Sequence, residues 1–125
     1  MKFGPLIRAA REDLKKGDRR YSVRQVALRI GVEPAYLSKV ERGEVRPPSE
    51  KKILLLAREL EKDPDALLAL AGKVASDVQD VIRKRPRIVA GLLRRIGDAP
   101  EKDLRALVGR YDEEGGKNPR KGRWP

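Results

Sequence analysis

The most informative segment of the sequence is residues 22–43, Ser-Val-Arg-Gln-Val-Ala-Leu-Arg-Ile-Gly-Val-Glu-Pro-Ala-Tyr-Leu-Ser-Lys-Val-Glu-Arg-Gly. Ser22 and Gln25 have the spacing of a capping box, in which each side chain satisfies a free backbone N–H of the other residue. This pair predicts the start of a short helix over residues 22–30. Gly31 follows, and glycine allows the positive φ that a sharp change of direction requires. The segment therefore predicts a helix that ends in a tight turn.

A second short helix is expected immediately after this turn, over residues 33–42. Pro34 suits its first turn, because that position needs no backbone N–H. Ala27 is small where the two helices would cross, and Val32 and Leu37 would fill the angle between them. Two short helices joined in this way indicate a helix-turn-helix, whose second helix can enter the major groove of DNA.

Helices are also expected on both sides of this motif, because apolar residues recur at helical spacing along most of the chain. Before the motif, the apolar spacing from Phe3 to Leu14 predicts one helix. After it, Ser49 and Asp63 are suitable caps for two more, and Gly72 ends the last of these. Beyond Gly72 the sequence predicts three amphipathic stretches in residues 73–111, interrupted at proline residues.

Residues 22–43 resemble the Cro/C1-type, or XRE-family, helix-turn-helix, and the most diagnostic run is 36–43. Pro48-Ser49 and residues 60–68 match the fourth and fifth helices of that family, so that the resemblance covers residues 3–72. It implies an all-α fold: a five-helix lambda-repressor-like domain, followed here by additional C-terminal helices. It also implies a DNA-binding domain of a transcriptional repressor that usually acts as a dimer.

Three parts of the chain are expected on these grounds. Residues 1–72 would form the DNA-binding domain, and residues 73–111 a helical extension that dimerises it. An alternative for the extension is that its helices fold back on their own chain. Residues 112–125 contain little to bury except Trp124, and their Gly-Gly and Asn-Pro pairs predict a flexible basic tail.

By the resemblance, the start of the second helix of the motif faces the bases. Lys39 can donate to guanine, Ser38 can donate or accept, and Ala35 can lie against a thymine methyl group. Glu33 could accept from cytosine, although it could equally cap the helix or repel phosphate. The expected base-contacting residues are Glu33, Pro34, Ala35, Ser38 and Lys39. The alternative for each is a solvated helix surface.

Contacts to phosphate are expected from the rim of the motif, where they would give affinity and register but no sequence information. The candidates are Arg24, Tyr36, Arg42, Arg46 and Lys51. Tyr36 could instead pack on the domain, and each cation could simply be solvated.

The family often ties its first helix to the recognition helix by an Arg–Glu pair, and here the resemblance implies Arg11 and Glu41. Two features depart from the family pattern. Val23 stands where many members have a phosphate-binding Gln, and the loop from Lys15 to Tyr21 is longer than usual.

Composition agrees with a nucleic-acid partner and argues against other classes. The 125 residues carry 30 Lys and Arg against 19 Asp and Glu, a formal net charge of +11. Basic proteins of this kind often bind nucleic acid. Cysteine and histidine are both absent, so no thiol nucleophile, histidine base or common metal site can form, and we expect no enzyme, cofactor or metal. No apolar run approaches the roughly 20 residues that span a bilayer, and we expect a cytoplasmic protein.

Taken together, these observations predict a sequence-specific regulator, acting as a repressor and binding double-stranded DNA as a homodimer on a palindromic operator. An alternative is an antitoxin or co-regulator whose main partner is a protein bound through residues 73–125. A third is a nonspecific nucleic-acid binder. Equal affinity for scrambled DNA would favour this last class.

Overall fold

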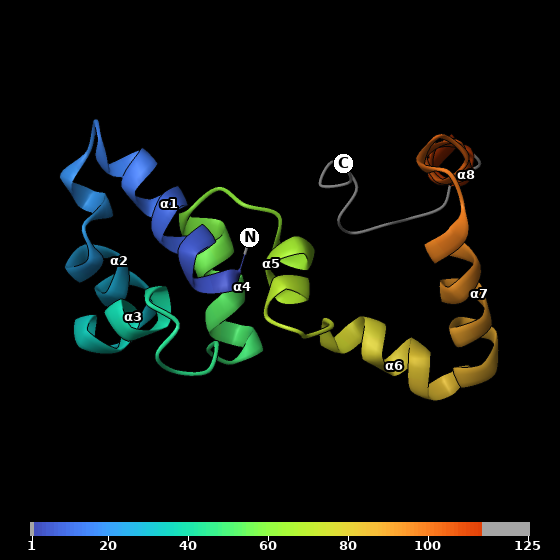
Figure 1. Ribbon diagram of the computed structural model, residues 1–125, viewed down its shortest axis with the longest axis horizontal. Coiled ribbons are helices and arrows are strands. Elements are labelled where there is room, and N and C mark those ends of the chain that lie inside the picture. Colours follow the sequence, from blue (N-terminus) through green and yellow to red (C-terminus); the bar gives the residue numbers. More distant parts are fainter. Residues whose placement is uncertain (1, 114–125) are drawn as a thin grey trace. The chain divides into compact units, whose positions relative to one another are not determined.

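The computed structural model describes the backbone of residues 2–113 and the side chains of residues 2–110. This part of the chain contains eight α-helices, one 3-10 helix and no strand, which confirms the all-α prediction (Figure 1). It divides into two compact units between Ala75 and Ser76. Each unit is described by itself below.

The first unit contains the helix-turn-helix and the helices that support it. Its elements are α1 (Phe3–Lys15), the 3-10 helix η1 (Arg19–Tyr21), α2 (Val23–Ile30), α3 (Pro34–Glu41), α4 (Glu50–Glu59) and α5 (Pro64–Leu70). The predicted helix starts are confirmed by their caps. Ser22, Ser49 and Asp63 each accept a hydrogen bond, through the side-chain oxygen, from the backbone N–H three residues on. Pro34 and Pro64 occupy the first turns of their helices, as their lack of an N–H favours.

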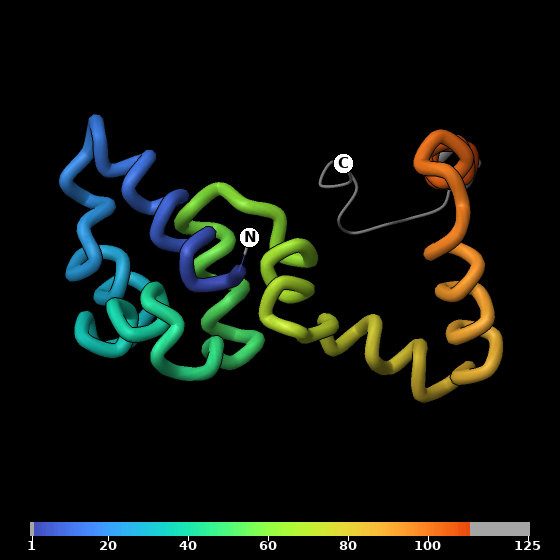
Figure 2. The backbone as a smooth tube through the Cα atoms, viewed as in Figure 1, coloured from blue at the N-terminus to red at the C-terminus, as the bar shows by residue number. Residues whose placement is uncertain are grey.

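The turn between α2 and α3 is made by Gly31, whose φ of 76° lies in the left-handed region. Its N–H donates to carbonyl oxygens of the last turn of α2, which closes that helix. Figure 2 follows the backbone through this turn. The sharp change of direction predicted from the glycine is therefore present, and it places α3 against α2.

One continuous apolar core holds all five helices of this unit together. α1 packs against α3, α2 packs against α3 and α4, and α4 packs against α5. Ala27 is fully buried, and Val32 packs against the core from the turn. The largest fully buried side chains are Ile7, Val26, Ile30, Leu37, Val40, Ile53, Leu56, Leu60, Leu67 and Leu68. A core of this kind fixes the position of α3, which has only two short turns of its own.

The loop before α2 contains an element that periodicity did not predict. α1 ends at Lys15, and residues 19–21 form η1 before Ser22 begins the cap of α2. Asp18 starts η1 by accepting a hydrogen bond from the N–H of Arg20. A three-residue 3-10 turn carries no apolar repeat, and this is why the hydrophobic pattern could not indicate it.

The second unit contains three helices: α6 (Ser76–Lys84), α7 (Pro86–Asp98) and α8 (Glu101–Glu113). They correspond to the three amphipathic stretches predicted from the sequence, with the interruption at Pro86. α6 packs against α7, yet neither helix contains a fully buried residue. α8 continues through Glu113, while Trp124 and the rest of the expected tail lie outside the described residues.

Candidate nucleic-acid interface

α3 has one face in the core and one face in solvent. Leu37 and Val40 are buried and point into the domain. On the other side, Glu33, Ala35 and Lys39 are exposed, and Pro34 and Ser38 are half-buried. The five predicted base-contacting residues therefore retain some or all of their accessibility, as a reading surface requires.

The buried end of α3 is held by α1 through a two-pronged ion pair. The Arg11 guanidinium donates from Nε to Glu41 Oε2 at 2.7 Å and from Nη2 to Glu41 Oε1 at 2.9 Å. Both side chains are almost completely buried, with exposed fractions of 5% for Arg11 and 4% for Glu41. The hydrogen bonds that Arg11 donates to Glu41 raise the pKa of Arg11. The pair implied by the family resemblance is thus present, and it ties the recognition helix to the first helix.

A second contact between α1 and α3 is made by backbone alone. A Cβ atom at Gly4 would lie 2.8 Å from the carbonyl oxygen of Glu41, and closer still to that of Val40. Real Cβ atoms do not approach so closely, so only glycine permits this packing. The sequence contains no signal for it, because glycine near a helix start has several ordinary explanations.

The turn of the motif has its own support from α4. Lys52 Nζ donates to the carbonyl oxygen of Ile30 at 2.8 Å and lies 3.4 Å from that of Gly31. A cation at a helix C-terminus satisfies carbonyl groups that have no partner within the helix. The neighbouring Lys51 is the phosphate contact expected from the sequence, whereas the role of Lys52 was not predicted. Lys51 is exposed, whereas Lys52 is half-buried and supports the turn.

The predicted phosphate contacts differ in how free they are. Arg24, Arg46 and Lys51 are exposed. Arg42 is also exposed, but its Nη2 donates to Glu44 Oε2 at 2.9 Å. This hydrogen bond raises the pKa of Arg42 and lowers the pKa of Glu44. A phosphate contact by Arg42 would therefore require it to exchange the Glu44 carboxylate for a phosphate.

Tyr36 and Val23 both contribute to the domain itself. Each is half-buried and packs against the core. For Tyr36 the packing alternative is therefore present, with part of the side chain still accessible. For Val23 the contact explains the apolar residue, since it fills space at the start of α2 where a glutamine would place an amide.

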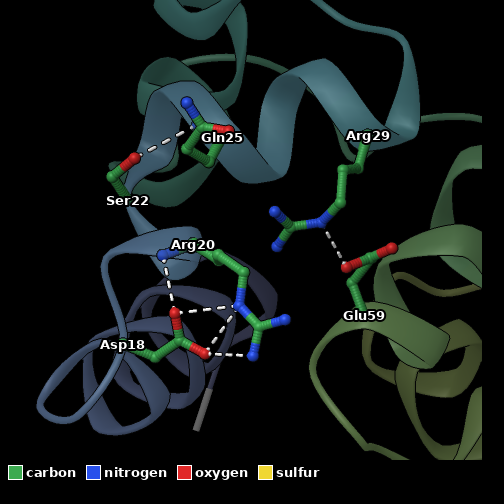
Figure 3. A network of polar contacts seen from close by, with 6 residues as sticks. All are labelled: Asp18, Arg20, Ser22, Gln25, Arg29 and Glu59. Atoms are coloured by element: carbon green, nitrogen blue, oxygen red, sulfur yellow. Dashed lines mark hydrogen bonds and ion pairs between the residues drawn. The ribbon is translucent and has the colours of Figure 1, made fainter.

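A polar network supports the segment in front of α2 (Figure 3). Arg29 on α2 donates to Glu59 on α4 at 2.7 Å, and its guanidinium carbon lies 5.4 Å from the ring centroid of Tyr21. Arg11 Nη1 also donates to the carbonyl oxygen of Tyr21 at 3.1 Å. The end of η1 is thus held by α1 and α2, and α2 is held by α4.

These features define a class of protein. A short helix, a left-handed glycine turn and a second helix with an exposed outer face form a helix-turn-helix DNA-binding domain. Comparison with protein families gives the same result, because residues 7–67 match the family described as helix-turn-helix. This match supports the resemblance to the Cro/C1-type, or XRE-family, helix-turn-helix that the sequence showed. Neither the curated proteins nor the solved structures include a match.

The described residues contain neither a membrane-spanning helix nor a metal-binding cluster. Within residues 2–113 no helix has the length and apolar character to cross a membrane. The same part of the chain contains no group of three or more acidic, histidine or cysteine side chains arranged to hold a metal ion.

Proposed function

We propose that this DNA-binding regulator is a repressor that binds a palindromic operator as a homodimer, with α3 in the major groove. Glu33, Pro34, Ala35, Ser38 and Lys39 would contact base edges. Arg24, Tyr36, Arg42, Arg46 and Lys51 would contact phosphates. Repression would follow from occlusion of a promoter. As expected from the sequence, we place this activity in the cytoplasm, with the DNA that it binds.

The observation that carries the proposal is the two-sided character of α3. Its inner face is fixed by buried apolar side chains and by the Arg11–Glu41 pair. Its outer face presents Lys39 and Ala35 in solvent. Because its buried face already fixes α3, binding in a major groove about 12 Å wide would carry little entropy cost for ordering the helix backbone.

The homodimer is supported by the second unit. In α6, α7 and α8 no described residue is fully buried, although each helix is amphipathic. Ile88, Leu92 and Leu93 on α7 are 66%, 52% and 54% exposed. A groove of about 400 Å³ between α7 and α8 is lined in part by Leu92, Ile96, Leu104 and Leu107. Exposed apolar side chains on neighbouring helices are typical of an interaction site. A helix-turn-helix that reads half a site needs a second copy to read the other half.

The same surface supports a second candidate function. An antitoxin or co-regulator would cover these helices with a different protein, bound through residues 73–125. A homodimer is favoured because it also supplies the symmetry that reading two half-sites requires. The two candidates differ in what copurifies with the chain from its native source.

Selection of bound duplexes from a random library tests the proposed function. We expect a palindromic winner with half-sites about one helical turn apart. Its affinity should exceed that for a scrambled duplex by about a thousandfold or more. Failure to enrich any sequence, together with the same salt dependence on both duplexes, would show that only phosphate is bound.

A further inference from the structure

A basic pocket lies between the end of α1 and the start of α2. Its volume is about 500 Å³, and the residues that line it are Lys15, Arg19, Arg20, Ser22 and Gln25. Three of these five side chains are cations and none is a carboxylate. Lys15 and Arg19 are exposed, so their charges are available to a ligand from solvent. None of the five belongs to the phosphate contacts proposed above.

Internal contacts hold this pocket in shape. Arg20 donates from Nε and Nη2 to the Asp18 carboxylate, at distances of 2.6 to 3.0 Å (Figure 3). Asp18 also caps η1, and Ser22 caps α2 by accepting from the N–H of Gln25 at 3.2 Å. Arg11 holds the carbonyl oxygen of Tyr21. Arg19 therefore projects from a short element that is fastened on both sides, and the cost of ordering the backbone on binding is low.

The chemistry of the lining points to a phosphate group. Asp18 compensates the charge of Arg20, which leaves two uncompensated charges, on Lys15 and Arg19. The Ser22 hydroxyl can still donate its hydrogen, and the side-chain amide of Gln25 offers two N–H donors. A compact anion with several acceptor oxygens satisfies cations and neutral donors of this kind together.

The position of the pocket indicates where that phosphate comes from. Ser22 and Gln25 belong to the start of α2, and in a helix-turn-helix the first helix crosses the DNA backbone. We propose that this pocket binds a backbone phosphate of the DNA that α3 reads, adding a contact made by the long α1–α2 segment of this chain. The inference rests on the proposed DNA binding and adds a site to it.

The test removes both free cations while leaving Arg20 and its role in η1 in place. Lys15→Gln/Arg19→Gln should weaken binding to selected and scrambled duplexes by the same factor, because a phosphate contact carries no sequence information. The slope of log affinity against log salt should become shallower by about 0.9 for the lost phosphate. Fluorescence anisotropy at four salt concentrations measures both quantities.

The matched control is Lys62→Gln/Lys73→Gln, which removes the same charge from two exposed lysines that do not line the pocket. Its salt slope should stay at the wild-type value, and thermal melting should show that both variants fold. The inference is wrong if the pocket variant keeps the wild-type slope, or if the control lowers the slope equally.

Two further measurements distinguish failure of the pocket proposal from failure of the proposed function, and DNA phosphate from a free anion. If library selection enriches no sequence, the proposed specific regulator fails, yet the slope on any duplex still tests the pocket. A free anion is the other source of a phosphate group. The DNA assignment is overturned if inorganic phosphate shifts the amide resonances of residues 19–22 more than chloride of equal ionic strength does, while the pocket variant keeps the wild-type salt slope on both duplexes.

Discussion

Neighbouring residues on α3 and α4 differ in burial and therefore have different roles. Lys39 is exposed on the outer face, whereas Val40 and Glu41, the next two residues, are buried in the core and in the ion pair with α1. Lys51 and Lys52 show the same division on α4, one in solvent and one on the turn of the motif. Substitutions at these positions should therefore separate DNA affinity, DNA specificity and stability.

Lys39→Ala tests direct readout. Loss of a donor to guanine should cost about 1–3 kcal/mol of binding free energy on the selected operator and relax the preference at one base position. Affinity for scrambled DNA should change little. Selection from a library with the variant protein measures the preference. An unchanged base preference would show that α3 is not placed in the groove as proposed.

Arg42→Ala should act on all sequences alike. The residue would exchange its ion pair with Glu44 for a phosphate, so its removal should lower affinity for operator and scramble by the same factor. The salt slope should fall by about one unit. A salt titration on both duplexes is the measurement. A loss confined to the operator would instead assign Arg42 to base contact.

The Arg11–Glu41 pair should show how a buried ion pair contributes to stability. Glu41→Leu alone leaves the Arg11 charge buried without its partner, and should lower the free energy of unfolding by about 3–5 kcal/mol. Arg11→Met/Glu41→Leu removes both charges and should recover most of that loss. Urea unfolding gives both values. A double variant as unstable as the single would mean that the pair is needed for packing rather than for charge compensation.

Among the helices, α1 and α2 pack directly against the recognition helix, and α4 supports the turn in front of it. α3 has only eight residues, and helices of this length are marginal by themselves in water. Its place is set by the Arg11–Glu41 pair, by the backbone contact at Gly4 and by Lys52, which caps the preceding helix. α1 therefore helps to position the recognition helix, although we propose no contact between α1 and the bases.

Gly4→Ala tests this dependence. The added methyl group would meet the carbonyl oxygens of Val40 and Glu41, and relief of the overlap should cost about 1–3 kcal/mol of stability. α3 should shift, and operator affinity should fall more than affinity for scrambled DNA. Thermal melting and anisotropy measure the two effects.

Gly91→Ala is the control for the glycine substitution. A Cβ at this position in α7 meets nothing within 4 Å, so the variant should gain helix propensity, worth about 0.5–1 kcal/mol. Equal effects of the two substitutions would show that the close approach at Gly4 is unimportant.

At the scale of the whole molecule, the two units have different kinds of core. The first encloses the buried side chains of five helices, while the described part of the second encloses none and presents its apolar residues at the surface. The first unit can be stabilised by its own packing. We propose that a second copy of the chain covers the apolar surface of the second unit.

Leu92→Glu should convert the dimer to a monomer, because it places a charge in the groove between α7 and α8. Operator affinity should fall while a single half-site is bound as before. Leu70→Glu, at a comparably exposed leucine of α5, should leave the mass unchanged. Sedimentation of the wild type and both variants measures the mass and hence the oligomeric state. A monomeric wild type would contradict the homodimer and favour the protein-partner alternative.

Local features of this protein could be predicted from a few neighbouring residues at a time. Ser22, Gly31 and Asp63 set where helices begin and end, because caps and left-handed turns depend on a few neighbouring residues. The apolar repeat gave the remaining helices, and the family resemblance supplied the Arg11–Glu41 pair. The all-α fold and the face of α3 available to DNA followed from these patterns.

The contacts between distant segments could not be predicted from local sequence patterns. Nothing local distinguishes Lys52 from Lys51, and the role of Lys52 comes from the position of the α2 carbonyl groups beside α4. Gly4 is required because the end of α3 lies against it. The pocket in front of α2 forms because η1, which has no apolar repeat, is held by Arg11 and by its own cap. These contacts join residues far apart in the chain, and their geometry depends on the packing of the complete core.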